Sequence, residues 1–438
     1  MTDIRSSLQN IYEQNYRAAP RIKTAALSEG VLAKSFSAQP PVQQAQGWLR
    51  DMYNKSGIPD YSIGDHPDFL HLRHTNNIEK CAVTTLFMDL EGSTRLNLFY
   101  TLEEVYFIKN AFIRGAIEII KSFDGHVHRI MGDAVMAFFG GKNRIQEDSL
   151  VDAVNCGAVL RLYADSVINK QLKGQGLDGE FGIRIGIDHG TNENVLWSSY
   201  GYFGMEEVTA TSFFVDIASK LQHQAGRNGI MIGQSLRNFM DFPEELLRVK
   251  TFQKDGQEEK EPFITPNYRN KDGNPINYTK HLLRVDDYLQ YSPLFQHDGP
   301  RLLMTDQAKV IPMIPVTADL YSSDKTIHLG PYAPSSATIA KETQVKFRVH
   351  MPVMPRLPYT VNFTVENHGT EAAIEADKKP GGEKNGNHST AREITTAQQH
   401  QCIEHWEHAG YRGLHYMTVE VVTAGKKLYR TTFGVYVR

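Results

Sequence analysis

The stretch AVTTLFMDLEGST at residues 82–94 decides the fold, together with the stretch RIMGDAVMAFFG at residues 129–140. In the first stretch a run of β-forming residues ends at Asp89, and Gly92, Ser93 and Thr94 follow as a turn. A helical spacing of apolar residues comes next, at Val105, Ile108, Phe112, Ala116 and Ile119. This pattern predicts a strand with an acidic residue at its end, followed by the N-terminus of a helix.

Two aspartates in these stretches have the chemistry of a phosphate site. Backbone N–H groups at the first turn can hold phosphate oxygens, and the Asp89 carboxylate beside them can hold the divalent metal that phosphates bring. The second stretch indicates a hairpin with Asp124-Gly125 as its turn, in which Gly132-Asp133 begin an apolar strand. Taken alone, either aspartate is more often a turn or cap residue. If the strands are neighbours, the two carboxylates can share a metal pair, which suits phosphoryl or nucleotidyl transfer.

Three segments, in this order, resemble the signature motifs of class III nucleotide cyclases: FMDLEGSTRL at 87–96, HRIMGDAVMAFFG at 128–140 and FGIRIGIDHG at 181–190. The family has an α+β, ferredoxin-like palm domain that works as a dimer, and the resemblance covers roughly residues 80–235. It implies two divalent metal ions, Mg²⁺ or Mn²⁺, at Asp89, Leu90 and Asp133. It also implies that the turn residues Gly92, Ser93 and Thr94 bind the substrate.

The segment FGIRIGID alternates strictly, with Ile183, Ile185 and Ile187 on one face of a strand and Arg184 on the other. Arg184 is therefore expected to point away from the core. In the cyclase family the arginine of this strand binds the substrate's triphosphate, and Arg184 is the matching position. A solvated strand arginine is the alternative.

The stretch VTATSFFVDIASKL at 208–221 resembles the family segment that carries base recognition and transition-state contacts. In the family this helix supplies its residues to the partner subunit's site, usually with the pattern VN-x-A-x-R. Here Asp216 stands in place of the asparagine that orients the ribose, and Lys220 in place of the arginine that neutralises charge on phosphate. Lysine keeps the charge but loses the planar fork of donors. The resemblance makes Asp216 and Lys220 the candidate catalytic residues, although the direction in which Asp216 turns stays open.

Base choice is expected to depend on Arg129 and Thr209. Adenylate cyclases typically have a lysine at the position of Arg129, and Thr209 occupies the second base-reading position. An arginine fills more of the pocket and offers a fork of donors, which suits O2 of a pyrimidine together with O4 of uracil or N3 of cytosine. The expected substrate is UTP or CTP, with a slight preference for UTP.

Composition limits the remaining possibilities. With 438 residues and 41% hydrophobic content, the chain can form two domains, and a net charge of −3 gives no case for binding nucleic acid or a membrane surface. Its three cysteines, Cys81, Cys156 and Cys402, indicate free thiols in a reducing compartment. Because the sequence has no apolar stretch of membrane-spanning length and no signal core, we expect a cytoplasmic protein.

We expect a helical and loop extension at residues 1–79, a catalytic domain at 80–240, a connecting region at 241–325 and a β-sandwich at 326–438. The connecting region is expected to hold the last palm strands at Leu246–Phe252 and His281–Val285. In the last region, alternation predicts strands around 345–349, 361–365, 414–422 and 428–437, with loops at Pro352–Pro358 and 376–390. Its segments PYTVNFTVENHGTEA and EHAGYRGLHYMTVEVV are similar to the AGS-C sensor domain of bacterial defence cyclases.

Two groups of histidines raise a metal hypothesis, and neither has a recognisable zinc spacing. For His66, His71 and His74 we favour exposed loop histidines. The other group, next to Trp406, is interpreted as a polar loop and comprises His400, Cys402, His405, His408 and His415.

Taken together, these features resemble the pyrimidine cyclases of the Pycsar antiphage system. The resemblance implies that a homodimer with shared active sites converts UTP or CTP to the 3′,5′-cyclic nucleotide, cUMP or cCMP, and pyrophosphate. The product would be a second messenger in antiphage defence that activates a separate effector. Two alternatives remain, a purine (adenylate) cyclase and a catalytically silent nucleotide-binding or scaffold protein. The second is motivated by Asp216 and Lys220.

Overall fold

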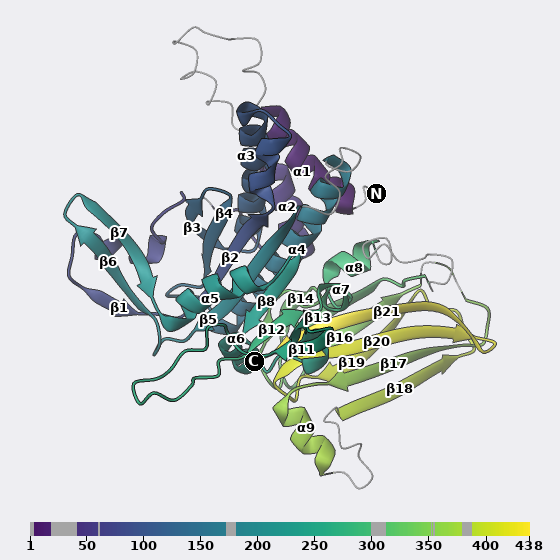
Figure 1. Cartoon of the computed structure of the whole chain (residues 1–438). Coiled ribbons are helices and arrows are strands. Elements are labelled where there is room, and N and C mark those ends of the chain that lie inside the picture. The colour runs from purple at the N-terminus through teal and green to yellow at the C-terminus, as the bar shows by residue number, and fades with distance from the viewer. Residues whose placement is uncertain are drawn as a thin grey trace. The chain divides into compact units, whose positions relative to one another are not determined.

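The computed structural model describes residues 4–18, 42–59, 62–171, 181–298, 312–351, 353, 355–378 and 388–438. The chain divides into two compact units. Figure 1 colours the chain by residue number. The first unit comprises Met1–Asp51, Lys55–Leu236 and Val249–Leu283. The second comprises Met52–Asn54, Arg237–Arg248 and Arg284–Arg438. Among the described residues, no helix has both the length and the apolar character needed to cross a membrane.

In the first unit, six strands of the central sheet follow the order β3-β4-β2-β5-β8-β12. Its strands are β2 (Val83–Glu91), β3 (His126–Met131), β4 (Ala134–Phe139), β5 (Gly182–Gly190), β8 (Gly229–Gly233) and β12 (Lys280–Leu283). With helices α3 and α4 inserted after β2 and β4, the chain follows the order β-α-β-β-α-β, and β2 lies between β4 and β5. This is the ferredoxin-like α+β arrangement that the sequence motifs predicted.

Helices cover both faces of this sheet. On one face, α4 (Gln146–Gln171) packs on β2 and β5, next to α3 (Leu102–Ser122) and α1 (Ile4–Ala18). On the other face, α5 (Phe213–Gln224) packs on β5, β2 and β8. The helix predicted from Val105 to Ile119 is α3, and it begins with a capping box between Thr101 and Glu104.

The hairpin turn lies elsewhere than predicted. The turn between β3 and β4 is at Gly132-Asp133, where Gly132 adopts a φ of 68° that favours glycine. Asp124-Gly125 instead follow the end of α3. The Asp124 carboxylate is held there by Arg50 at 2.7 Å and Lys55 at 3.2 Å, so these tertiary contacts fix a turn that is not part of the hairpin.

The remaining elements of the first unit surround this sheet. A three-stranded sheet has the order β1-β6-β7, with β1 (Ile78–Lys80), β6 (Leu196–Tyr202) and β7 (Met205–Thr211). The stretch 208–221 is therefore divided between β7 and α5, with Ser212 as the N-cap that accepts a hydrogen bond from the Phe214 N–H. The smaller elements are α2 (Val42–Met52), η2 (Pro67–Leu72), η3 (Ser93–Leu98) and the hairpin β10 (Lys250–Lys254)–β11 (Gln257–Glu261).

Short elements begin the second unit: α6 (Gln234–Met240), which starts in the first unit, η4 (Glu244–Leu246), β9 (Leu247–Arg248), α7 (Val285–Leu289) and α8 (Pro293–Asp298). The strand expected at Leu246–Phe252 is therefore interrupted, since β9 and β10 are separate strands. The strand expected at His281–Val285 is β12, and it stops at Leu283 because Val285 begins α7.

Two sheets form the rest of the second unit, in the orders β14-β13-β16-β19 and β15-β21-β20-β17-β18. The strands of the first sheet are β13 (Val316–Tyr321), β14 (His328–Tyr332), β16 (Gln344–His350) and β19 (Cys402–His408). Those of the second sheet are β15 (Thr338–Ile339), β17 (Tyr359–Asn367), β18 (His388–Thr396), β20 (Gly413–Thr423) and β21 (Lys426–Val437). Inward residues of both sheets form one buried cluster, so the predicted β-sandwich is confirmed.

The loop predicted at 376–390 is shorter than expected. Its first residues end α9 (Thr370–Asp377), and its last residues begin β18. Residues 379–387 lie outside the described part of the chain.

Candidate active site

The strand register brings the two predicted metal aspartates to one end of the central sheet. Asp89 lies near the end of β2, and it pairs with Ala134, the first residue of β4. Asp133 directly precedes Ala134 in the β3–β4 turn. Leu90 follows Asp89, and because its side chain is apolar and buried, only its backbone carbonyl can be a metal ligand.

Each of these carboxylates has a cationic partner in the chain. Asp89 accepts hydrogen bonds from the Arg184 guanidinium and, at 3.3 Å, from Gln222 Nε2. Asp133 lies 3.5 Å from Lys109 Nζ. The side chains of Asp89 and Asp133 are 15% and 21% exposed, so both remain accessible. Two neighbouring carboxylates and a backbone carbonyl are hard oxygen ligands, and this donor set fits Mg²⁺ or Mn²⁺.

The turn after β2 lies directly beside these carboxylates. Gly92 adopts a left-handed conformation with a φ of 82°, which turns the chain into η3. The buried Ser93 donates its hydroxyl hydrogen bond to Asp133, whereas Thr94 is exposed. Ser93 is therefore the residue of the turn whose side chain contacts the candidate metal site.

Arg184 lies on a covered face of its strand. The structure confirms the alternation, because Ile183, Ile185 and Ile187 are fully buried. Arg184 lies on the opposite face, as expected, and α5 covers that face at Gly186, where a side chain would overlap the helix backbone. Arg184 remains one-quarter exposed at the end of this covered face and pairs with Asp89. It is thus part of the carboxylate site and not a solvated strand residue.

Arg129 is held by a residue that the sequence did not indicate. Its guanidinium forms an ion pair with Glu207 of β7, and the same Glu207 oxygen lies 2.6 Å from Nε2 of His128. The His128 side chain is fully buried, and its Nδ1 must donate to the Gly64 carbonyl at 2.9 Å, since a carbonyl oxygen only accepts. Glu207 and Thr209 are two residues apart on one strand and share a face. Arg129 and Glu207 therefore form an ion pair within the chain, and Thr209 lies on the same face of β7 as Glu207.

Asp216 and Lys220 lie on α5, on a different side of the helix from Gln222. A helix turns by about 100° per residue, so Lys220 lies roughly 200° around the axis from Gln222, which reaches Asp89. Lys220 Nζ stands 5.5 Å from the centre of the Tyr268 ring, and Asp216 is exposed. Within the described residues, neither side chain has a hydrogen bond or ion pair with Asp89 or Asp133. The two candidates thus face away from the aspartates of their own chain.

The first group of histidines is only partly as expected. His71 and His74 have exposed side chains, but His66 is buried, and the expectation of an exposed residue is wrong for it. Its ring packs against Trp197 and His126. Burial, together with the neighbouring His126, lowers the pKa of His66 to about 4. His66 is a neutral core residue at physiological pH.

The second group of histidines is only partly a loop, since His400 lies in the loop between β18 and β19 and the other members lie in strands. Cys402, His405 and His408 belong to β19, and His415 belongs to β20. His405 is buried and stacks on the ring of Phe363, with 4.3 Å between centroids. Among the described residues, no three or more His, Cys, Asp or Glu side chains gather where they could hold a metal ion. His405, His408 and His415 are residues of the sandwich strands.

Comparison with known proteins identifies both parts of the chain. Residues 302–438 match the family model described as "Adenylyl/Guanylyl and SMODS C-terminal sensor domain". One cytidylate cyclase of Escherichia coli is 36% identical over 82% of this chain and 75% of its own length, and a second is 31% identical over 93% and 91%. A cytidylate cyclase of Staphylococcus aureus is 30% identical over 89% and 86%.

Among solved structures, the adenylyl cyclase CyaB from P. aeruginosa is 20% identical, with a TM-score of 0.37, over 47% of this chain and 95% of that one. The sequence identities to the three cytidylate cyclases extend over most of both chains, and the sensor-domain match covers the sandwich. The chain therefore belongs to the class III nucleotide cyclases, in the group of the cytidylate cyclases, with an AGS-C sensor domain at residues 302–438.

Proposed function

We propose that this chain is a pyrimidine nucleotide cyclase that converts CTP to 3′,5′-cyclic CMP and pyrophosphate. The observation that carries the proposal is the identity of 30–36% to three cytidylate cyclases over at least 82% of the chain. The names of these relatives favour CTP as the substrate, whereas the sequence motifs gave a slight preference for UTP. Asp89 and Asp133 at one end of the sheet support turnover over the alternative of a silent nucleotide-binding protein.

In this proposal Asp89, Asp133 and the Leu90 carbonyl hold divalent metal ions. Divalent ions held there would supply Lewis-acid chemistry, with which the ribose 3′-oxygen would be activated for attack on the α-phosphorus and the charge of the leaving pyrophosphate neutralised. The chain's own side chains supply the remaining charge. Arg184 forms an ion pair with Asp89 in the structure, and in the complex its guanidinium can bind a phosphate oxygen of the substrate in place of Asp89. Gly92, Ser93 and Thr94 surround the phosphates from the turn, where backbone N–H groups can donate to their oxygens.

We infer that two chains build each active site. Asp216 and Lys220 face away from the aspartates of their own chain, and a second copy related by a two-fold axis can bring its aspartates to them. Lys220 then neutralises charge that develops on the phosphate, and Asp216 lies beside the ribose. A closed two-fold dimer contains two such composite sites.

Arg129 and Thr209 read the base in this proposal. The fork of Arg129 offers N–H donors, which suit O2 and N3 of cytosine. Arg129→Ala should therefore reduce the differences in kcat/KM among the four nucleotides. It should have little effect on the free energy of unfolding, because the side chain is 44% exposed and does not pack in a core.

We further propose that the cyclic product acts as a second messenger in antiphage defence and activates a separate effector protein. The similarity to the sensor domain and the resemblance to the Pycsar cyclases support this role. The three free cysteines agree with a reducing compartment such as the cytoplasm.

The experiment is a comparison of CTP, UTP, ATP and GTP turnover by the full chain, with Mg²⁺ or Mn²⁺. CTP is expected to be the best substrate, and Asp89→Asn and Asp133→Asn should abolish turnover with an unchanged circular dichroism spectrum. ATP as the best substrate would support the purine cyclase. No turnover of any nucleotide would support the silent nucleotide-binding protein.

A further inference from the structure

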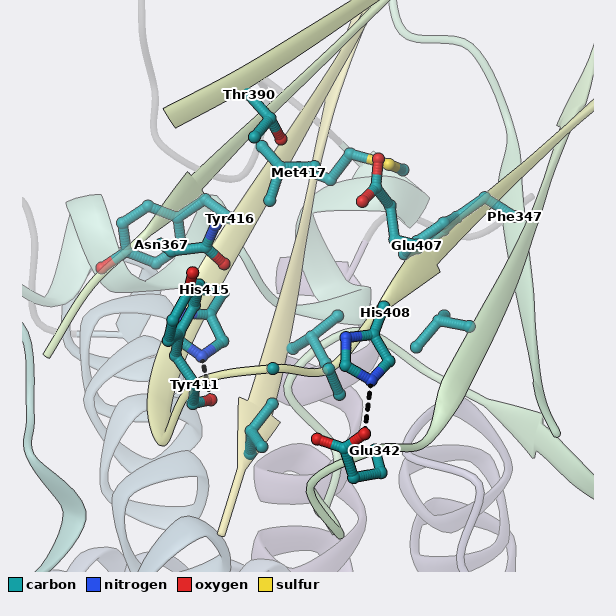
Figure 2. Close-up of a pocket in the computed structure, with 16 residues that line it drawn as sticks. Glu342, Phe347, Asn367, Thr390, Glu407, His408, Tyr411, His415, Tyr416 and Met417 are labelled. Atoms are coloured by element: carbon teal, nitrogen blue, oxygen red, sulfur yellow. Dashed lines mark hydrogen bonds and ion pairs between the residues drawn. The ribbon is translucent and has the colours of Figure 1, made fainter. Parts of the chain in front are cut away.

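The β-sandwich of the second unit contains a cavity of about 360 Å³ (Figure 2). Protein interiors are close-packed and rarely leave voids much larger than a water molecule. A cavity of this volume is instead in the range of small-molecule sites. Thr390 of β18 and Glu407 of β19 both line it, and these are the last strands in the order of the two sheets. The cavity therefore lies between the two sheets, towards their edge strands.

Most of the cavity wall is apolar. Inward residues of four strands form this wall: Val345, Phe347, Val365, Met417, Val435 and Val437. All except Val365 are buried members of the sandwich core, and Val365 packs against that core. An apolar ring or a branched aliphatic group would replace water there and gain contact with the Phe347 ring.

Carboxylates supply the charge of the cavity. Glu407 and Glu342 line it on the same side as Phe347, with His408 near them, as Figure 2 shows. Glu342 accepts a hydrogen bond from His408 at 3.0 Å, and one Glu407 oxygen is bonded to His405. None of the residues that line the cavity is a lysine or an arginine. The basic residues next to lining residues in the chain are engaged elsewhere. Lys341 pairs with Glu371, Lys346 with Glu404 and Arg348 with Asp319. Arg412 donates to the Phe239 carbonyl and Arg438 to the Thr338 carbonyl.

His415, on the opposite side of the cavity, adds no positive charge. Its Nδ1 accepts from the His368 N–H at 3.1 Å, and its Nε2 donates to the Tyr411 carbonyl at 2.6 Å. This pattern requires a neutral ring with one proton. Burial lowers the pKa of His415 to about 4, so the ring stays neutral at physiological pH.

We propose that this cavity binds a small organic cation, with an aromatic or branched apolar body against Phe347 and Met417 and a protonated amine directed at Glu407. A charge-assisted hydrogen bond to a carboxylate is stronger than a neutral one, and it gains further in a partly desolvated cavity. A phosphate or carboxylate ligand would instead meet two carboxylates and no lysine or arginine, and the His408 ring beside them is already hydrogen-bonded to Glu342. The site therefore rejects the nucleotide substrate and product, and the sensor domain recognises a different class of molecule.

Two probes with the same ring and opposite charge test this proposal. Tryptamine and indole-3-acetate both carry an indole, and each is titrated into the full chain by calorimetry, with saturation-transfer NMR to identify the contacting protons. Tryptamine is expected to bind saturably and at least tenfold more tightly than indole-3-acetate. Cyclic CMP, used as a third probe, should not displace tryptamine.

Glu407→Gln tests the role of the carboxylate, with Glu404→Gln as the matched control. Both residues are on β19, but Glu404 does not line the cavity and pairs with Lys346. Glu407→Gln should weaken tryptamine binding about tenfold and remove the preference over indole-3-acetate, whereas Glu404→Gln should change neither. If Glu407→Gln does not fold, as judged by its thermal transition, Glu342→Gln replaces it. Equal binding of the two probes, no saturable binding of tryptamine, or unchanged binding in the Glu407 and Glu342 variants would overturn the proposal.

Discussion

Helix α5 approaches the central sheet closely at Gly186, and Gly186→Ala tests that approach. A Cβ built at Gly186 would lie 2.9 Å from the Gln222 Cα and nearer still to the carbonyl oxygen of Ala218. Carbon atoms normally make contact at about 3.5–4.0 Å. The obstructing atoms belong to the backbone and cannot rotate away, so α5 has to move from β5 by roughly 1 Å.

This displacement should lower both activity and stability. Gln222, which donates to Asp89, and Lys220 move with the same helix. A 1 Å misplacement can lower a rate about 100-fold, and an overpacked core site typically costs about 1–3 kcal/mol in the free energy of unfolding. We expect kcat/KM for CTP to fall about 100-fold in Gly186→Ala. Steady-state kinetics and urea unfolding of the full chain measure the two effects.

Gly47→Ala is the matched control, because a Cβ at Gly47 in α2 meets no atom within 4 Å. It should keep full activity and raise the free energy of unfolding by about 0.4–1 kcal/mol, since alanine restricts the unfolded chain. Activity of Gly186→Ala within threefold of the parent, with unchanged unfolding, would refute the close packing of α5 on β5 as the basis of the site.

Three further predictions concern the dimer, the base and pH. Mixing Asp133→Asn and Lys220→Ala chains, each inactive alone, should restore about a quarter of parental activity. Random exchange of subunits makes half of the dimers mixed, and each mixed dimer has one of its two sites intact. No recovery of activity despite proven subunit exchange would contradict shared sites. Glu207→Gln should free the Arg129 side chain and reduce the ratio of kcat/KM for CTP to that for UTP severalfold, while a ratio equal to the parent's would separate Glu207 from base choice. Burial raises the pKa of Asp188 to about 7, above an unfolded value of about 3.9, so its contribution to stability is present below pH 4 and is lost as pH rises to 7. Asp188→Asn should accordingly reduce the fall in the free energy of unfolding between pH 5 and pH 8, and urea titrations with the same pH dependence as the parent would disprove this.

The elements around Asp89 were predictable because each has a local signal. The alternation of β5 and the helical spacing of α3 depend only on residues within the same element. The position of the hairpin turn could not be predicted from the sequence, because Asp124-Gly125 and Gly132-Asp133 are both typical turn sequences. The contacts of Asp124 with Arg50, which is 74 residues away, decide between them.

The candidate site divides in the same way. Asp89 and Asp133 follow from the motifs, because the residues around each of them resemble a family signature. The role of Glu207 could not be predicted from the sequence, because its ion pair with Arg129 joins residues 78 positions apart in two different sheets. The residues around it in its strand form no recognisable motif. The burial of His66 has the same origin, because its ring packs on Trp197 and His126 from distant parts of the chain.

The order in which the chain visits the two units limits how such proteins can recombine. The strand β12 pairs with β8 in the central sheet, yet it comes after the segment Arg237–Arg248 of the second unit. A junction after Met240 would separate β8 from the β12 of its own chain and leave it to pair with a β12 from the other gene, and a poorly matched partner exposes a strand edge that is a template for aggregation. We therefore expect that exchange of the sensor domain between genes succeeds where the breakpoint follows Leu283, because β12 then stays with the sheet in which it pairs with β8.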